Sequence, residues 1–197
     1  MAKLRHLLKY LAGTKDYCLV LRPELKLSST VTSLDLKVYC DSDWAGCSKT
    51  RKSTSGVVVA LLGCTVFTCS RTQATVALSS GEAELYAIGL AVQEALFVKT
   101  LILEASLAKA VKLTVHTDST AGKSIASRYG LGKKTKHIDL RYLYMQDLVA
   151  SGVLILQKIR TESNTSDLMT KYLSHDVTFK HSAALGCYDP GAHFIGS

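Results

Sequence analysis

The sequence predicts an α/β fold in which helices flank a mixed five-stranded sheet. Three short runs rich in Val and aromatic residues follow one another between residues 36 and 70, as expected for consecutive antiparallel strands. Later in the chain, two further strand-like runs alternate with helical patterns, and this alternation implies right-handed parallel crossovers. A length of 197 residues and a hydrophobic content of 47% suit one globular domain with a sizeable core.

The first 34 residues are interpreted as a connector that precedes this domain. Leucines recur at helical spacing within residues 2–11, and Gly13 follows as a helix stop. A short strand is expected at residues 16–21, before Pro23.

The core elements are expected in the order βββ-α-β-α-α-β-α. They are strands at residues 36–44, 54–63 and 64–70, a helix at 80–103, a strand at 111–118, a helix at 119–127, a Gly- and Lys-rich loop at 129–136, a helix at 137–150, a strand at 153–159 and a short helix at 165–171. We therefore place the domain at residues 35–173 and leave residues 174–197 as a tail without an assigned element.

The net charge of +8 is unevenly distributed. Residues 119–160 carry eight basic and two acidic groups, whereas residues 31–118 carry eight of each. This arrangement suits a carboxylate site flanked by a phosphate-binding surface, and it equally suits a solvated basic face. Because there is no unbroken apolar run of membrane-spanning length and no secretory signal, we expect an intracellular protein without a membrane partner. The six cysteines have no CxxC spacing and are expected to be reduced, mostly as core fillers.

Asp41 and Asp43 lie on one face of the first core strand, because side chains alternate with a period of two. A central strand has little reason to carry two carboxylates on one face. Asp41 lies deeper in the strand and is the better candidate for a metal ligand, with Asp43 as an auxiliary candidate. The alternatives are that Asp43 belongs to the following turn and that Asp41 keeps an edge strand soluble.

Glu82 and Glu84 are about 200° apart around their helix, so only one of them can face the sheet. Ser79 and Glu82 have the S-x-x-E spacing of a capping box, in which the glutamate reaches back to the amide of the serine. Glu84 instead heads the apolar stripe that is expected to pack on the sheet. An acid at that position needs a counter-charge, which either a metal ion or an arginine would supply.

Asp118 and Asp167 lie at the boundaries of elements. Asp118 ends a strand at the sheet edge where α/β proteins favour ligand sites, although an aspartate there also suits a helix N-cap. Asp167 lies in the first turn of a short helix, where the helix dipole alone favours an acid. Carboxylates are the hard oxygen ligands that Mg²⁺ prefers, and a two-ion site of this kind fits phosphodiester hydrolysis.

Six motifs occur in a fixed order: YCDSDWAG, TRKSTSG, VALSSGEAELYA, VHTDS, TKHIDLRY and SDLMTK. Together they resemble the ribonuclease H (RNase H) domain of copia-type LTR retrotransposon Pol polyproteins. The leading HLLKYLAGTKDYCLVL resembles the end of the connection that follows reverse transcriptase in those polyproteins. The resemblance extends over about residues 3–173.

The resemblance implies an RNase H-like fold with sheet order 3-2-1-4-5 and an acidic tetrad that is both catalytic and metal-binding. Carried over by motif, the tetrad is Asp41, Glu84, Asp118 and Asp167. It would hold two Mg²⁺ ions, or Mn²⁺, and cut the RNA strand of an RNA–DNA hybrid during reverse transcription. The implied partners are that hybrid and a reverse transcriptase in the same or a parent polyprotein, in the cytoplasm within a virus-like particle or in the nucleus.

Basic and hydroxyl side chains in two loops are the candidates for contacts to the hybrid, since phosphate contacts of this kind are independent of base sequence. These candidates are Lys49, Arg51, Lys52, Ser53, Thr54, Lys133, Lys134 and Lys136. His137 is an auxiliary candidate for orienting substrate, and the alternative is a helix-terminal residue that forms only local hydrogen bonds.

Two other functions remain open at the level of sequence. The sequence departs from the family pattern at Cys47, where the family usually has an acid, and at Tyr172, where it has a proline. These departures, and the lack of a preceding polymerase segment, motivate the alternative of a catalytically silent nucleic-acid-binding remnant. The glutamate on the first long helix argues against a third class, an integrase or resolvase.

Overall fold

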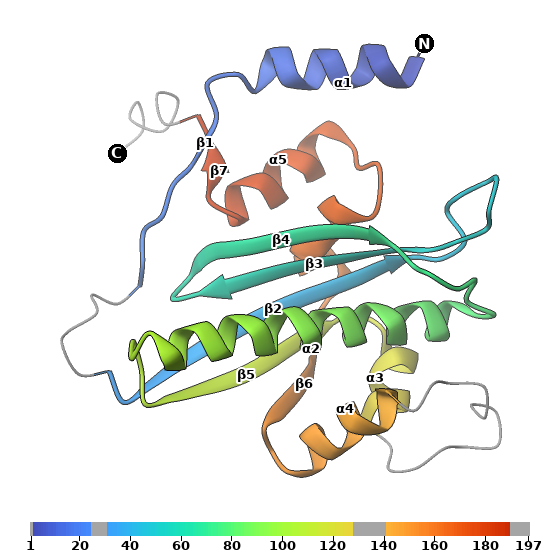
Figure 1. Cartoon of the computed structure of the whole chain (residues 1–197). Coiled ribbons are helices and arrows are strands. Elements are labelled where there is room, and N and C mark those ends of the chain that lie inside the picture. The colour runs from blue at the N-terminus through green and yellow to red at the C-terminus, as the bar shows by residue number, and fades with distance from the viewer. Residues whose placement is uncertain (1, 25–30, 128–140, 190–197) are drawn as a thin grey trace.

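The computed structural model describes residues 2–24, 31–127 and 141–189 (Figure 1). Its centre is a five-stranded sheet with the order β4-β3-β2-β5-β6. The strands are β2 (Ser33–Asp43), β3 (Thr54–Leu61), β4 (Cys64–Thr72), β5 (Ala110–Thr117) and β6 (Leu154–Lys158). Strands β2, β3 and β4 pair antiparallel, whereas β5 pairs parallel with both β2 and β6. The expected mixed sheet, with its first three strands antiparallel and its order 3-2-1-4-5, is confirmed.

Helices and short 3-10 turns cover both faces of this sheet. They are α2 (Ser80–Glu104), α3 (Thr120–Ser127), α4 (Arg141–Ala150), η1 (Thr161–Ser163), η2 (Thr165–Met169) and α5 (His175–Ala184). Figure 1 shows α2, in green, running along one face of the sheet. Val38 and Cys40 of β2 face α2, so by strand alternation Asp41 points to the opposite face, where η2 packs on β2 and β3.

The main core lies between α2 and the sheet. Leu36 and Val38 of β2 are fully buried and belong to the same apolar cluster as Leu85 and Ile88 of α2. Each such side chain stabilises the fold by about 1.5–3 kcal/mol when it is buried. By length and composition α2 is apolar enough to cross a membrane, yet here its apolar stripe packs on the sheet.

Gly56 brings η2 close to the other face of the sheet. This residue pairs with Asp41, and a Cβ atom at position 56 would lie 2.7 Å from Cβ of Met169 and 2.9 Å from the carbonyl oxygen of Ser166. Such contacts are shorter than real Cβ atoms make. The glycine is therefore required by the approach of η2 rather than by its own backbone conformation.

The connector and the tail lie side by side. Helix α1 (Ala2–Gly13) begins and ends as expected, whereas the expected strand at 16–21 is reduced to β1 (Cys18–Leu19). The tail, for which no element was expected, forms α5 and the short strand β7 (Cys187–Tyr188), which pairs antiparallel with β1. The division into residues 1–34, 35–173 and 174–197 stays a prediction.

Three further expectations need correction or restriction. The expected helix at 165–171 is the 3-10 turn η2, which ends at Met169. Of the expected helix at 137–150, the part from Arg141 onward is confirmed, and residues 137–140 lie outside the described residues. All six cysteines are free. Cys40 and Cys64 are buried and Cys69 packs against the core, so only half of the six are core fillers.

Candidate metal centre

Three elements bring carboxylates to one edge of the sheet. Asp41 lies near the end of β2, and Asp118 directly follows β5. Because β2 and β5 are parallel, their carboxyl ends meet at the same edge. Glu84 lies near the start of α2, which begins at that edge.

Asp41, Glu84 and Asp118 can present carboxylate oxygens that all lie within 4.8 Å of one another. Asp41 is the most enclosed of them, with 1% of its surface exposed. Three converging carboxylates repel one another unless a proton or a cation compensates their charge. Oxygen ligands at this spacing suit a divalent cation such as Mg²⁺ or Mn²⁺.

Glu84 fits the role of a metal ligand particularly well. Its Oε1 atom accepts a hydrogen bond of 2.9 Å from the hydroxyl of Ser42, which orients the carboxylate. Its Oε2 atom is buried and has no hydrogen-bond partner among the described residues. Burial, together with the negative charge of Asp41, raises the pKa of Glu84 to about 8. The ionised form of this carboxylate thus lacks a sufficient counter-charge from the described residues.

Asp167 is brought to the same side of the sheet but is not one of the three converging acids. It is buried in η2, and its Oδ1 atom lies 3.3 Å from Nζ of Lys171. The same ammonium group lies 3.1 Å from Oδ2 of Asp41, so Lys171 bridges the two aspartates. Burial and the charge of Asp41 raise the pKa of Asp167 to about 6.

Asn164 anchors the turn that carries Asp167. Its side chain is fully buried, and its amide nitrogen donates a 3.0 Å hydrogen bond to the carbonyl oxygen of Cys40 in β2. Its Oδ1 atom accepts a 2.6 Å hydrogen bond from the hydroxyl of Ser166. Thr170, directly after η2, donates a hydrogen bond to Asp41. The turn is therefore held by polar contacts to the strand that supplies the most buried acid.

Glu82 and Glu84 have different contacts, as expected, although one predicted contact of Glu82 is wrong. The hydroxyl of Ser79 accepts a hydrogen bond of 3.2 Å from the amide of Glu82, as in a capping box. The Glu82 carboxylate, however, reaches the amide of Leu78 at 2.8 Å rather than that of Ser79, and it also accepts a hydrogen bond from Tyr86. These contacts give Glu82 a structural role at the start of α2.

The loop between β2 and β3 carries part of the expected nucleic-acid surface. Lys49 and Arg51 are exposed, whereas Lys52 and Thr54 are half-buried. The structure does not support a phosphate contact from the side chain of Ser53. This side chain is fully buried, and its hydroxyl accepts a 3.0 Å hydrogen bond from the amide of Ala45.

Of the remaining site residues predicted from the sequence, one lies near the metal centre and four lie outside the described residues. Asp43 is the last residue of β2 and is half-buried, but it is not part of the group formed by Asp41, Glu84 and Asp118. Lys133, Lys134, Lys136 and His137 lie outside the described residues.

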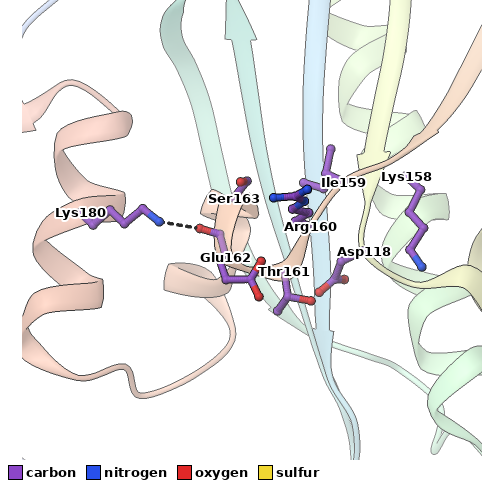
Figure 2. Close-up of a pocket in the computed structure, with 8 residues that line it drawn as sticks. All are labelled: Asp118, Lys158, Ile159, Arg160, Thr161, Glu162, Ser163 and Lys180. Atoms are coloured by element: carbon purple, nitrogen blue, oxygen red, sulfur yellow. Dashed lines mark hydrogen bonds between the residues drawn. The ribbon is translucent and has the colours of Figure 1, made fainter.

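Sequence reasoning missed two sets of functional candidates. The first is Lys171, whose spacing of four residues from Asp167 was a visible signal for an ion pair. The second lines a groove of about 750 Å³ beside Asp118, shown in Figure 2. Besides Asp118, its lining consists of Lys158, Ile159, Arg160, Thr161, Glu162, Ser163 and Lys180.

The chain has relatives of known type among retrotransposon polyproteins. No protein-family model matches the chain. Over 165 residues, 84% of its length, the chain is 32% identical to a retrovirus-related Pol polyprotein from transposon TNT 1-94 of Nicotiana tabacum. It is 28% identical over 183 residues, 93% of its length, to one from transposon RE2 of Arabidopsis thaliana. The chain spans 12% of the length of each relative.

Among solved structures, the chain is similar to LC11-RNase H1, a protein isolated from compost by a metagenomic approach. The sequence identity is 15% and the TM-score is 0.50, and the match covers 69% of this chain and 92% of the other. This similarity shows that the fold is RNase H-like.

Proposed function

The chain is homologous to the retrovirus-related Pol polyproteins of copia-type transposons over most of its length, and we propose that it hydrolyses the RNA strand of RNA–DNA hybrids. The observation that carries this proposal is the convergence of Asp41, Glu84 and Asp118 at one sheet edge of an RNase H-like fold. Three acids from two strands and a helix are costly to hold together unless they bind a cation.

The residues of the centre would have different roles in metal binding. Asp41, Glu84 and Asp118 would hold a divalent ion, and a pair of such ions would supply water activation and stabilisation of a leaving 3′ oxygen in phosphodiester hydrolysis. Asp167 would take part in holding a second ion, as the family resemblance implies. Lys171 would then compete with that ion for the oxygens of Asp41 and Asp167.

The relatives are polyproteins, and this supports a setting within reverse transcription. We propose that the chain works beside a reverse transcriptase, as part of the same polyprotein or of a parent polyprotein. Its substrate would then be the RNA–DNA hybrid that the polymerase produces. Contacts to phosphates that are independent of base sequence would suit complete degradation of the RNA strand.

Cleavage of a labelled RNA–DNA hybrid in Mg²⁺ tests this proposal. We expect the purified chain to cut the RNA strand and Asp41→Asn to cut it at least about 100-fold more slowly, because this change removes a metal ligand. Lys112→Gln is the matched control, since Lys112 is exposed and lies near the start of β5, at the opposite end of the strand from Asp118. Equal cleavage by the wild type and Asp41→Asn, or cleavage by neither, would contradict the proposal.

A second candidate function is a nucleic-acid-binding remnant without catalysis. The observation that favours it is the ammonium group of Lys171, which already pairs with two of the four acids and offsets one of their two negative charges. A remnant of this kind would bind the hybrid in a salt-sensitive manner and would not cut it in the presence of any divalent ion.

A further inference from the structure

Three cationic side chains beside the metal centre form no ion pair with an acid of the described residues. Lys158, at the end of β6, donates a 2.5 Å hydrogen bond to the hydroxyl of Thr120. Lys180, on α5, donates a 3.1 Å hydrogen bond to the carbonyl oxygen of Glu162. Both of these acceptors are neutral, so neither of them compensates a positive charge.

Arg160 is exposed as well, and within residues 2–24, 31–127 and 141–189 no carboxylate forms an ion pair with any of the three. Elsewhere in the described chain, by contrast, Arg71 lies 2.7 Å from Glu94, and Lys171 lies 3.1 Å from Asp41. Against the two carboxylates of the same groove, Asp118 and Glu162, the three cations leave an excess of one positive charge beside the acidic centre.

All three side chains line the groove of about 750 Å³ that also contains Asp118. Figure 2 shows Lys180 reaching in from α5 on one side and Lys158 lying on the other, with Arg160, Thr161 and Glu162 of the connecting loop between them. Because Asp118 also belongs to the three converging acids, the groove leads directly to the metal centre.

We propose that this groove binds phosphate groups of the nucleic-acid strand whose scissile bond lies at the metal centre. The inference rests on the proposed nuclease function and names the surface that holds the substrate strand next to the cut. Lys158, Arg160 and Lys180 supply charge, and the hydroxyls of Thr161 and Ser163 add neutral donors of the kind that also contact phosphates. Helix α5, in the segment after residue 173, thereby becomes one wall of the substrate site.

A nucleic-acid strand fits this groove better than a free anion does, because the groove is open and continuous with the acids. The acids alone repel phosphates, and a strand held at the metal centre needs a cationic surface directly beside it. The groove meets that need with cations from two separate parts of the fold, the β6 end with its following loop and α5.

The test is hybrid binding by the double variant Arg160→Gln, Lys180→Gln, measured by fluorescence anisotropy in EDTA over a range of salt concentrations. Both replaced side chains are exposed, so the fold is expected to persist. The matched control is Lys109→Gln, Lys112→Gln, which removes two exposed lysines at the other end of β5. Circular dichroism melts verify that all three chains are folded.

We expect the groove variant to bind the hybrid about tenfold more weakly at low salt than the wild type. The slope of log K against log salt should fall by about two, or about 0.9 for each lost phosphate contact. The control should keep the wild-type affinity and slope. Equal loss in the groove variant and in the control, or no loss in either, would overturn the proposal.

Inorganic phosphate distinguishes a free anion from a strand. If phosphate raises the melting temperature of the wild type but not of the groove variant, while both bind the hybrid equally, the groove takes free anions and the proposal is wrong. Because binding is measured without metal, a chain that never cuts the hybrid still tests the groove. Conversely, metal-dependent cleavage with unchanged binding in the variant would reject the groove and leave the nuclease function intact.

Discussion

At the scale of single residues, the metal centre holds four acidic side chains, and an ion pair with a cation is formed only by Asp41 and Asp167 among the described residues. Lys171 offsets one of the two negative charges of Asp41 and Asp167, and although burial opposes its charge, these two aspartates raise its pKa above the usual range. On the other side, no described cation forms an ion pair with Glu84 or Asp118, although Lys158 and Lys180 line the groove beside Asp118. A divalent ion is thus most favourable next to Glu84, whose Oε2 atom has no donor in the described structure.

Replacement of Lys171 tests this balance. We expect Lys171→Met to bind Mn²⁺ more tightly than the wild type, because the variant removes a cation that competes for the same oxygens. We also expect the metal-free variant to lose about 1–3 kcal/mol of unfolding free energy, since Asp41 stays buried without its partner while Lys171 is partly exposed. Calorimetric titration and urea unfolding measure the two effects, with Lys112→Met as the control because Lys112 is exposed at the far end of β5, and a weaker affinity for Mn²⁺ would contradict the first.

Local geometry predicted some of these residues and not others. Glu84 could be separated from Glu82 because the angle around a helix and the cap at Ser79 depend only on nearby residues. The role of Lys171 could not be predicted, because its second partner, Asp41, is 130 residues away in the chain. Likewise, the burial of Ser53 depends on how the loop folds back to Ala45, which spacing alone does not reveal.

At the scale of elements, the close packing of η2 on β2 and β3 positions the acidic side of the sheet. The amide of Asn164 fixes this turn to the backbone of Cys40, and Gly56 leaves it room. Because η2 carries Asp167 and is directly followed by Thr170, its position relative to Asp41 determines the geometry of the centre.

A methyl group at Gly56 should therefore disturb both stability and metal binding. Gly56→Ala places a Cβ atom against Met169 and the backbone of Ser166, and such overpacking typically costs about 1–3 kcal/mol. We expect urea unfolding to show this loss and Mn²⁺ affinity to fall as η2 shifts. Gly13→Ala is the control, because nothing lies within 4 Å of a Cβ atom at that position. Unchanged Mn²⁺ affinity in a destabilised Gly56→Ala chain would show that the position of η2 does not affect metal binding.

The elements also differ in how far the sequence predicts them. Strands β2 to β6 and helix α2 follow from alternation, from an apolar stripe and from a cap, all of which are local patterns. Helix α5 was not predicted because its support is tertiary: the side chain of Ser174 forms no capping hydrogen bond, and Phe179 packs edge to face on Tyr17, with ring centroids 5.8 Å apart. The 3-10 form of η2 similarly depends on the distant Cys40.

At the scale of the whole molecule, the raised pKa values make stability depend on pH. Because the folded chain holds a proton on Glu84 more tightly than the unfolded chain does, protonation of Glu84 stabilises the fold. This contribution is fully present below pH 4.5, the ordinary pKa, and is lost as the pH rises to about 8. Asp167 adds a smaller effect of the same sign, which is lost by about pH 6.

We expect the melting temperature of the metal-free chain to fall as the pH rises from about 5 to 8. Glu84→Gln should flatten this fall, because glutamine does not titrate. Mn²⁺ should stabilise the wild type increasingly as the pH rises, since the ion binds the ionised carboxylate and releases its proton. Differential scanning calorimetry measures all three, and an equally steep fall in Glu84→Gln would show that other groups cause it.

The pairing of β1 with β7 joins residues about 170 positions apart, and it has a consequence for the newly made chain. At a synthesis rate of about 5–20 residues per second, about 10–30 s pass between the synthesis of β1 and that of its partner strand β7. During that interval β1 is an open strand edge next to a helix, α1, whose leucines are more than half exposed. Until residues 187 and 188 are made, β1 and the exposed leucines of α1 therefore lack this partner strand, and they form a segment at risk of aggregation.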